Sequence, residues 1–135
     1  MGHLLVSMHP DDDFKGVCPY HGNCLEGVAA GPAIEKRYGK KGHDLAEDKK
    51  VWEIEAFYLA QALVNYTLVL SPEKIILGGG VMKQTQLLPL IKKEFSQLMA
   101  DYVSTPALDE YIVTPELKDN AGIMGCLLMA LEENK

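Results

Sequence analysis

Basic side chains are scarce in this sequence of 135 residues. Thirteen Lys and Arg stand against nineteen Asp and Glu, which gives a formal net charge of −6. The sequence has no dense run of Lys and Arg that would replace the counterions of a phosphate backbone. We therefore expect no direct nucleic acid partner.

Long apolar runs are also missing. The longest candidate, Val51–Leu70, is interrupted by four polar residues, which are Glu53, Glu55, Gln61 and Asn65. A membrane-spanning helix needs about 20 predominantly apolar residues. The N-terminus has neither the charged nor the apolar region of a signal peptide. We expect a cytoplasmic protein that makes no contact with a membrane.

Cysteine is rare, and its count of three is odd. Cys18 and Cys24 lie close together among histidines, whereas Cys126 lies in an apolar helical pattern. In a reducing compartment, such a cluster favours metal ligation over a disulfide. Cys126 is expected in the core.

The chain has room for one domain and hardly for two, with 47% apolar and 24% charged residues. The spacing of apolar residues predicts three long helices and two strands, of which the first is expected to be buried. The helices cover Val51–Leu70, Gln84–Tyr102 and a stretch that is capped by Asp119 or Asn120 and ends at Leu131; the strands cover Ile75–Leu77 and Tyr111–Thr114. This alternation indicates an α/β fold, although the sheet is small for so many helices and the chain looks incomplete.

Shorter elements are expected in the first third of the chain. A short strand over Leu4–Met8 would end at Pro10, which has no amide donor. Gly31–Pro32 interrupts a helical pattern, so two short helices are more compatible with the sequence than one long helix. Asp44 and Glu47 have the spacing of a capping pair ahead of the next helix.

A metal-binding pattern lies in Cys18–Cys24, where two thiols and the imidazole of His21 fall within seven residues. Zn²⁺ is the natural occupant, because structural zinc takes four Cys or His ligands and two thiolates cancel its charge. The fourth ligand is His3 or His9. Four protein ligands leave no open position, so the zinc would be structural and would contribute on the order of 10 kcal/mol to folding. The alternative is an exposed loop with free thiols, and His43, alone in a loop, is expected to be exposed.

A glycine turn, Gly78–Gly80, follows the first predicted strand. Such a turn lets a nucleotide approach bare backbone. It is not a P-loop, since no Gly-Lys-Ser/Thr follows, and it is not the dinucleotide fingerprint, since the glycines are contiguous. Taken alone, the turn is equally compatible with a purely structural role.

Four short segments carry a family resemblance. They are Gly2–His3, Cys18–Gly27 (CPYHGNCLEG), Gly31–Ile34 (GPAI) and Ile76–Met82 (ILGGGVM). Together they resemble the ROK family of sugar kinases and repressors. The commoner family pattern has three cysteines, and the histidine at position 21 is what points to the bacterial fructokinase branch.

The resemblance implies roles for individual residues. It assigns the zinc ligands as His3, Cys18, His21 and Cys24, and it places His3 and Glu26 beside the sugar. It also places six residues at the ATP site, which are Pro32, Gly78, Gly79, Gly80, Val81 and Met82. Without the resemblance, Glu26 is simply an acidic residue in the first turn of a helix.

The resemblance covers essentially the whole chain, yet it corresponds only to the C-terminal part of such a kinase. It implies the C-terminal lobe of an actin-like or ribonuclease H-like ATPase fold, with a zinc-bound loop segment at 1–24, a helical and strand core at 25–135, and the N-terminal lobe absent. Family members carry an Asp-x-Gly-Gly-Thr phosphate turn and a catalytic Asp in an Asn-Asp motif, and neither motif occurs here. We therefore expect no catalytic residue in this chain and negligible activity from it alone. His9 and the acidic turn Asp11–Asp13 are expected to be solvated surface.

The implied function is ATP-dependent phosphoryl transfer to the 6-hydroxyl of D-fructose, with Mg²⁺, by the complete enzyme. One alternative is a zinc-stabilised sugar-binding or dimerisation module of a ROK-type repressor, and another is a zinc-ordered interaction domain with no small ligand. Four aromatic side chains are expected on the surface of the long helix, namely Trp52, Phe57, Tyr58 and Tyr66. Such a surface favours self-association, and the family likewise implies a homodimer.

Overall fold

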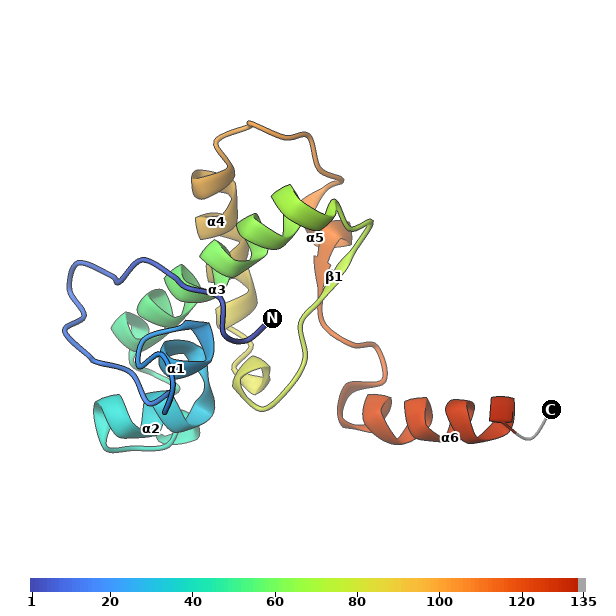
Figure 1. Cartoon of the computed structure of the whole chain (residues 1–135), viewed down its shortest axis with the longest axis horizontal. Coiled ribbons are helices and arrows are strands. Elements are labelled where there is room, and N and C mark those ends of the chain that lie inside the picture. The colour runs from blue at the N-terminus through green and yellow to red at the C-terminus, as the bar shows by residue number, and fades with distance from the viewer. Residues whose placement is uncertain (134–135) are drawn as a thin grey trace.

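Two packed helices form the centre of the molecule (Figure 1). The structure is a computed structural model that describes residues 1–133. Helix α3, Lys49–Leu70, packs along helix α4, Leu87–Met99. Residues four apart on α4 are buried in the interface, and these are Leu87, Ile91, Phe95 and Met99. Both long helices were predicted, because this spacing places apolar residues on one face of a helix.

The predicted helix Gln84–Tyr102 is shorter at both ends than the pattern suggested. A 3-10 turn at Val81–Lys83 precedes α4. The helix ends at Met99 because Ala100 adopts a left-handed conformation with φ of 49°. Among residues 1–133, no helix combines the length and the apolar character needed to cross a membrane.

Two short helices lie beneath α3, as predicted from the Gly31–Pro32 break. Helix α1 covers Leu25–Ala29 and helix α2 covers Gly31–Tyr38, and between them Ala30 is extended with φ −105° and ψ 159°. Pro32 thus lies in the first turn of α2, where a helix does not need its missing amide donor. The two helices pack on α3 and hold the N-terminal arm, residues 1–24, against it.

The sheet has two parallel strands, β1 at Ile75–Ile76 and β2 at Ile112–Val113, with α4 in the connection. A short helix, α5 at Leu108–Tyr111, leads directly into β2. The prediction that the first strand is buried is wrong at Ile76, which is 62% exposed. With only two strands and short pairing, the described residues cover one side of β1 and leave the other open.

Two local predictions for the first half of the chain are also wrong. Leu4–Met8 does not form a strand; Leu5 makes an isolated antiparallel bridge to Cys24 instead. Asp44 and Glu47 do not form a capping pair, because the 3-10 turn η1, Gly42–Leu45, begins directly after Lys41 and has no side-chain cap. Pairing and turn geometry, both set by tertiary contacts, override these local preferences.

Helix α6, Ala121–Glu133, follows a 3-10 turn at Lys118–Asn120 and extends away from the other elements (Figure 1). None of its residues is buried. Cys126 is exposed, so its predicted place in the core is wrong. The large apolar side chains of α6 are exposed by 40% or more, and they are Ile123, Met124, Leu127, Leu128, Met129 and Leu131.

The aromatic side chains of α3 also differ from the prediction. Trp52 and Tyr58 are buried, and Phe57 and Tyr66 are half-buried, so α3 does not present the expected apolar surface. The indole N–H of Trp52 donates to the carbonyl of Leu45 at 2.8 Å. Large exposed apolar side chains lie instead along α6 and at the C-terminal end of α3, where Leu68, Val69 and Leu70 are 45–79% exposed.

Glu55 is a fully buried acid within α3. Neither of its carboxylate oxygens has a hydrogen-bond partner in the described part of the chain. Burial raises the pKa of Glu55 from 4.5 to about 8, against a smaller lowering by the charge of Arg37. The carboxyl group is therefore mostly protonated at neutral pH.

This burial predicts a pH dependence of stability that Glu55→Gln removes. Below pH 4.5 the group is protonated in both states; between 4.5 and 8 only the unfolded chain releases the proton. The free energy of unfolding therefore falls as pH rises through this range, by up to about 1.4 kcal/mol per pH unit, and levels off above it.

Urea unfolding at pH 5, 6, 7 and 8 measures the slope. Glu53→Gln, at an exposed neighbouring position, is the control. Equal slopes in the parent and in Glu55→Gln would contradict the assignment.

Candidate metal centre

Four potential metal ligands converge where the N-terminal arm meets α1. One ligand atom from each of His3, Cys18, His21 and Cys24 lies within 4.8 Å of the other three. His3 Nδ1 lies 3.7 Å from Cys18 Sγ and 3.6 Å from Cys24 Sγ, and His21 Nδ1 lies 3.8 Å from Cys18 Sγ. In a tetrahedron with ordinary zinc bond lengths, sulfur and nitrogen ligands lie about 3.6 Å apart. The donor set and its spacing fit Zn²⁺.

The backbone of the loop sets this convergence. Cys18 and Gly22 exchange two backbone hydrogen bonds, at 3.1 and 2.9 Å, which close a tight turn. Gly16 and Gly27 pack against the carbonyl oxygen of Gly22 so closely that a Cβ at either position would overlap it. Glycine at these positions lets the loop fold back onto the start of α1.

The two thiols differ in their surroundings. A hydrogen bond from the backbone N–H of His21 is the main cause that lowers the pKa of the Cys18 thiol from 9.0 to about 7. Burial raises the pKa of the Cys24 thiol. Cys18 thus has substantial thiolate character near neutral pH, and the thiolate is the form that binds metal.

Histidine 3, and not His9, is the histidine that the fold brings to the cysteines. Backbone hydrogen bonds of 2.8 Å from Leu25 to Leu4 and from Glu26 to Gly2 place the start of the arm beside α1. His9 lies elsewhere: its Nδ1 accepts a hydrogen bond from the amide of Asp11, and its ring packs edge-on against Phe57. His43 is exposed, as expected, beside Asp44.

Glu26 lies on the far side of the His3 ring from the thiols. Its Oε2 is 3.6 Å from His3 Nε2, and both side chains are more than half exposed. Since His3 Nδ1 faces the sulfur atoms, Nε2 is free to orient this carboxylate. Glu26 also lies in the first turn of α1, so its placement fits the simpler helix-end interpretation as well.

The predicted nucleotide residues lie around two hollows. Gly78, Gly79 and Met82 line one of about 530 Å³ after β1, and Gly80 and Val81 line another of about 420 Å³ together with Gly31 at the start of α2. Pro32 is exposed next to Gly31 but does not line either hollow. Gly79 has φ of +97°, which strains any other residue. The structure therefore groups the turn residues and leaves Pro32 at the margin.

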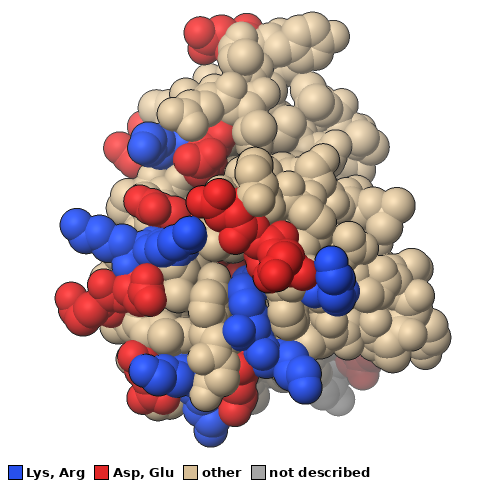
Figure 2. Space-filling view, turned by 90° about the vertical axis from the view of Figure 1, so that its left-hand side faces the viewer, with Lys and Arg blue, Asp and Glu red and all other residues tan. Residues whose placement is uncertain are grey.

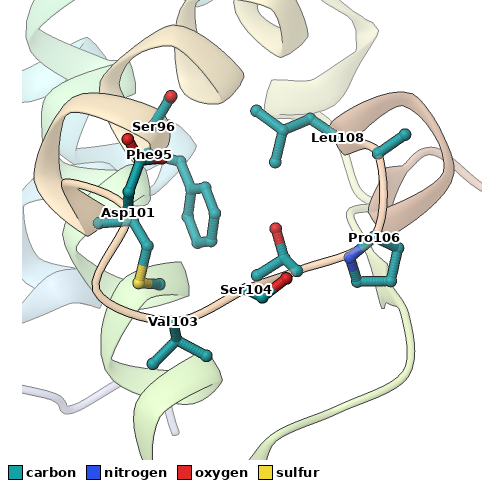
Figure 3. A pocket seen from close by; sticks show the side chains of 10 residues that line it. Phe95, Ser96, Asp101, Val103, Ser104, Pro106 and Leu108 are labelled. Atoms are coloured by element: carbon teal, nitrogen blue, oxygen red, sulfur yellow. The ribbon is translucent and has the colours of Figure 1, made fainter.

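Outside the metal centre and these two hollows, residues 1–133 bring no further predicted site residues together. A hollow of about 450 Å³ lies between the end of α4 and the loop 101–108 (Figure 3), and Asp101 is the one charged residue in its lining. On the face in Figure 2, Lys and Arg are interspersed with Asp and Glu and do not form a continuous basic area.

Asp12 is a buried charged residue that the sequence pattern did not reveal. The prediction of a solvated acidic turn is wrong at this position, since the Asp12 side chain is 4% exposed and lies 3.1 Å from Arg37, itself 6% exposed. The arm offered one signal: apolar Phe14 lies two residues after Asp12, beyond the turn at Pro10–Asp11, and packs on the core. In an extended chain, residues two apart face the same side.

The comparisons with known proteins agree with one another. A model described as the ROK family matches residues 1–133. A protein of Bacillus subtilis (strain 168) named "Putative fructokinase" is 51% identical over 134 residues, which cover 96% of this chain and 45% of that protein. A "Fructokinase" of Pediococcus pentosaceus is 52% identical over 130 residues, again with 96% and 45% coverage. The chain thus spans a little less than half the length of these relatives.

A solved structure shows a similar fold. It is described as a "putative sugar kinase" from Cytophaga hutchinsonii ATCC 33406, and it superposes with a TM-score of 0.60 at 19% identity. The match covers 93% of this chain and 50% of that one. The predicted α/β fold of a sugar kinase is confirmed at this level, while the metal in the loop remains a prediction.

We expect the chain to bind one zinc ion through the side chains of these four residues. Chain purified without chelator should carry about one Zn²⁺, since the four donors fill a tetrahedral shell. His3→Ala and Cys24→Ser should each lose most of it, because a vacant position weakens a closed site. Elemental analysis measures the content.

Two histidine variants are matched controls for this experiment. His9→Ala and His43→Ala remove imidazoles that lie outside the cluster, and they should keep the zinc. Zinc-free parent protein, or equal loss in His9→Ala and His3→Ala, would contradict the assignment.

Proposed function

The chain belongs to the ROK family, and we propose that it supplies the zinc-bearing, sugar-facing half of an ATP-dependent fructokinase. The observation that carries the proposal is identity of about half of all residues with proteins named fructokinases over 96% of this chain. None of these relatives is named a repressor, so no observation favours the repressor alternative. Because the chain spans less than half of each relative, the activity belongs to the complete enzyme.

The zinc in this proposal is structural. His3, Cys18, His21 and Cys24 would hold it, and with four protein ligands it has no open position for substrate. Its effect would be to order the arm, which contributes only one partly buried side to the core. The arm then holds His3 against α1.

Glu26 and His3 form the proposed sugar contact. The Glu26 carboxylate is exposed, so its two oxygens can accept hydrogen bonds from two neighbouring hydroxyls of the hexose. His3 Nε2, 3.6 Å away, orients that carboxylate. Exposure of both side chains supports this role, because a sugar contact must be accessible from solvent.

The nucleotide contact is proposed at the turn after β1. Gly78, Gly79, Gly80, Val81 and Met82 would border ATP, with Pro32 at the edge. Bound ATP and Mg²⁺ would supply the phosphoryl group and neutralise its charge. The bare backbone of the turn would let the nucleotide approach closely, and catalysis would depend on holding the γ-phosphate in line with the sugar hydroxyl.

The remaining parts of the enzyme are proposed to come from a second lobe. We assign residues 1–135 to the C-terminal lobe of an actin-like or ribonuclease H-like ATPase fold, with the catalytic Asp on the other lobe. The exposed apolar side chains of α6 support this assignment, since a helix that is apolar on all sides is normally covered on all sides. The homodimer and the cytoplasmic location rest on the family resemblance and on composition, because α3 does not present the expected apolar surface.

Fragment complementation tests the proposed function. The chain alone should not release ADP from ATP and fructose, whereas the chain mixed with the part of the Pediococcus pentosaceus fructokinase that it does not match should do so. A stable complex on gel filtration without phosphoryl transfer, or full activity of the chain alone, would overturn the proposal.

Glu26→Gln tests the sugar contact in the complemented enzyme. Loss of a charged acceptor should raise the KM for fructose roughly 10-fold or more. The zinc content and the KM for ATP should stay the same. Glu35→Gln, an exposed acid on α2, is the control. An unchanged KM for fructose in Glu26→Gln would remove this residue from the site.

A further inference from the structure

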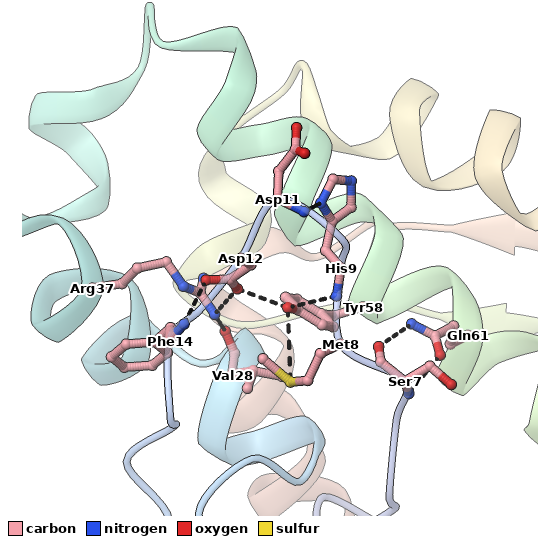
Figure 4. Close-up of polar contacts among 10 residues, drawn as sticks. All are labelled: Ser7, Met8, His9, Asp11, Asp12, Phe14, Val28, Arg37, Tyr58 and Gln61. Atoms are coloured by element: carbon pink, nitrogen blue, oxygen red, sulfur yellow. Dashed lines mark hydrogen bonds and ion pairs between the residues drawn. The ribbon is translucent and has the colours of Figure 1, made fainter.

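A buried polar network fastens the N-terminal arm to the helices (Figure 4). Asp12 Oδ2 lies 3.1 Å from Arg37 Nη2 on α2 and accepts a hydrogen bond of 2.7 Å from the Tyr58 hydroxyl on α3. The same hydroxyl accepts a bond from the amide of His9, and Asp12 Oδ1 accepts one from the amide of Phe14. Both backbone bonds are 3.1 Å long, so the network holds the arm at three successive points.

Arg37 joins two parts of the chain that both carry metal ligands. Its Nη2 also donates to the carbonyl oxygen of Val28, in α1, at 2.9 Å. Four residues after Phe14 the arm reaches Cys18, and α1 begins directly after Cys24. The guanidinium group therefore bridges the segment that leads to Cys18 and His21 and the helix that follows Cys24.

The position of Arg37 is determined by its ring contacts as well as by its hydrogen bonds. Its guanidinium carbon lies 4.6 Å from the centre of the Phe14 ring and 5.5 Å from that of Tyr58. Meanwhile Nε and Nη1 are buried and have no hydrogen-bond partner among the described residues. Two buried nitrogens without a partner among these residues cost stability, which the bonds of Nη2 and the ring contacts have to offset.

We propose that Arg37, held by Asp12 and Tyr58, is a positioning residue that sets the spacing between the two halves of the metal centre before the metal binds. The inference rests on the zinc site of the proposed function. A preformed site binds metal more tightly, because the ordering of the loop does not have to accompany binding. Arg37 would act through the backbone of the arm and of α1, without touching the metal.

Co²⁺ titration of the metal-free chain tests the proposal. Co²⁺ takes the same ligands and gives an absorption spectrum that reports tetrahedral thiolate coordination. Arg37→Lys keeps the positive charge but loses the planar group that spans Asp12 and Val28, and it should weaken Co²⁺ binding at least 10-fold. Tyr58→Phe removes a single hydroxyl and should weaken it several-fold.

Two controls separate positioning from general destabilisation. Asp11 lies on the same arm and forms an exposed ion pair with Lys50 of α3. Asp11→Asn breaks this pair and should leave the Co²⁺ affinity unchanged. Circular dichroism and the fluorescence of buried Trp52 establish that each metal-free variant is folded at the temperature of the titration. If Arg37→Lys does not fold, Tyr58→Phe decides the question.

Folded Arg37→Lys and Tyr58→Phe with the affinity of the parent would overturn the proposal and leave the metal centre intact. A parent chain that binds no Co²⁺ would overturn the metal centre itself, and the positioning role with it. Reduced affinity in both variants and in Asp11→Asn alike would also overturn it, because any change in the arm would then have the same effect.

Discussion

Attachment of the N-terminal arm is the constraint on which the proposed site depends. Residues 1–24 contain no helix and no extended strand, so regular backbone hydrogen bonds hold them only at isolated points. Side chains provide the rest of the attachment, through the cluster of two thiols and two imidazoles and through the buried pair of Asp12 and Arg37. Together with the backbone hydrogen bonds of Gly2 and Leu4 to the start of α1, these attachments place His3 beside Glu26.

Burial is uneven across the molecule, and the chain spans a little less than half the length of its relatives. The pair of α3 and α4 is packed to exclude solvent, whereas β1 is open on one side and α6 is exposed along its length. Open sheet faces and apolar helices are normally covered by further elements. The relatives are more than twice as long as the region they share with this chain.

Sequence patterns predicted the elements that depend on local spacing. The two long helices, the break at Gly31–Pro32 and the positions of both strands follow from apolar periodicity and from proline. Predictions that required knowledge of neighbouring elements were wrong: Cys126 is exposed, Trp52 is buried and Asp12 is paired inside. An apolar pattern shows which face of a helix needs covering, but not whether another element covers it.

The candidate metal centre shows the same division between local and tertiary information. The spacing of Cys18, His21 and Cys24 along the chain is local, because one seven-residue loop carries all three, and the sequence alone determined that they are candidate ligands. The contact with His3 spans 15 residues to Cys18 and depends on the path of the arm beside α1. The family resemblance implied His3, but only the tertiary structure gives the physical reason for His3 over His9, since the direction of an irregular segment is set by what it packs against.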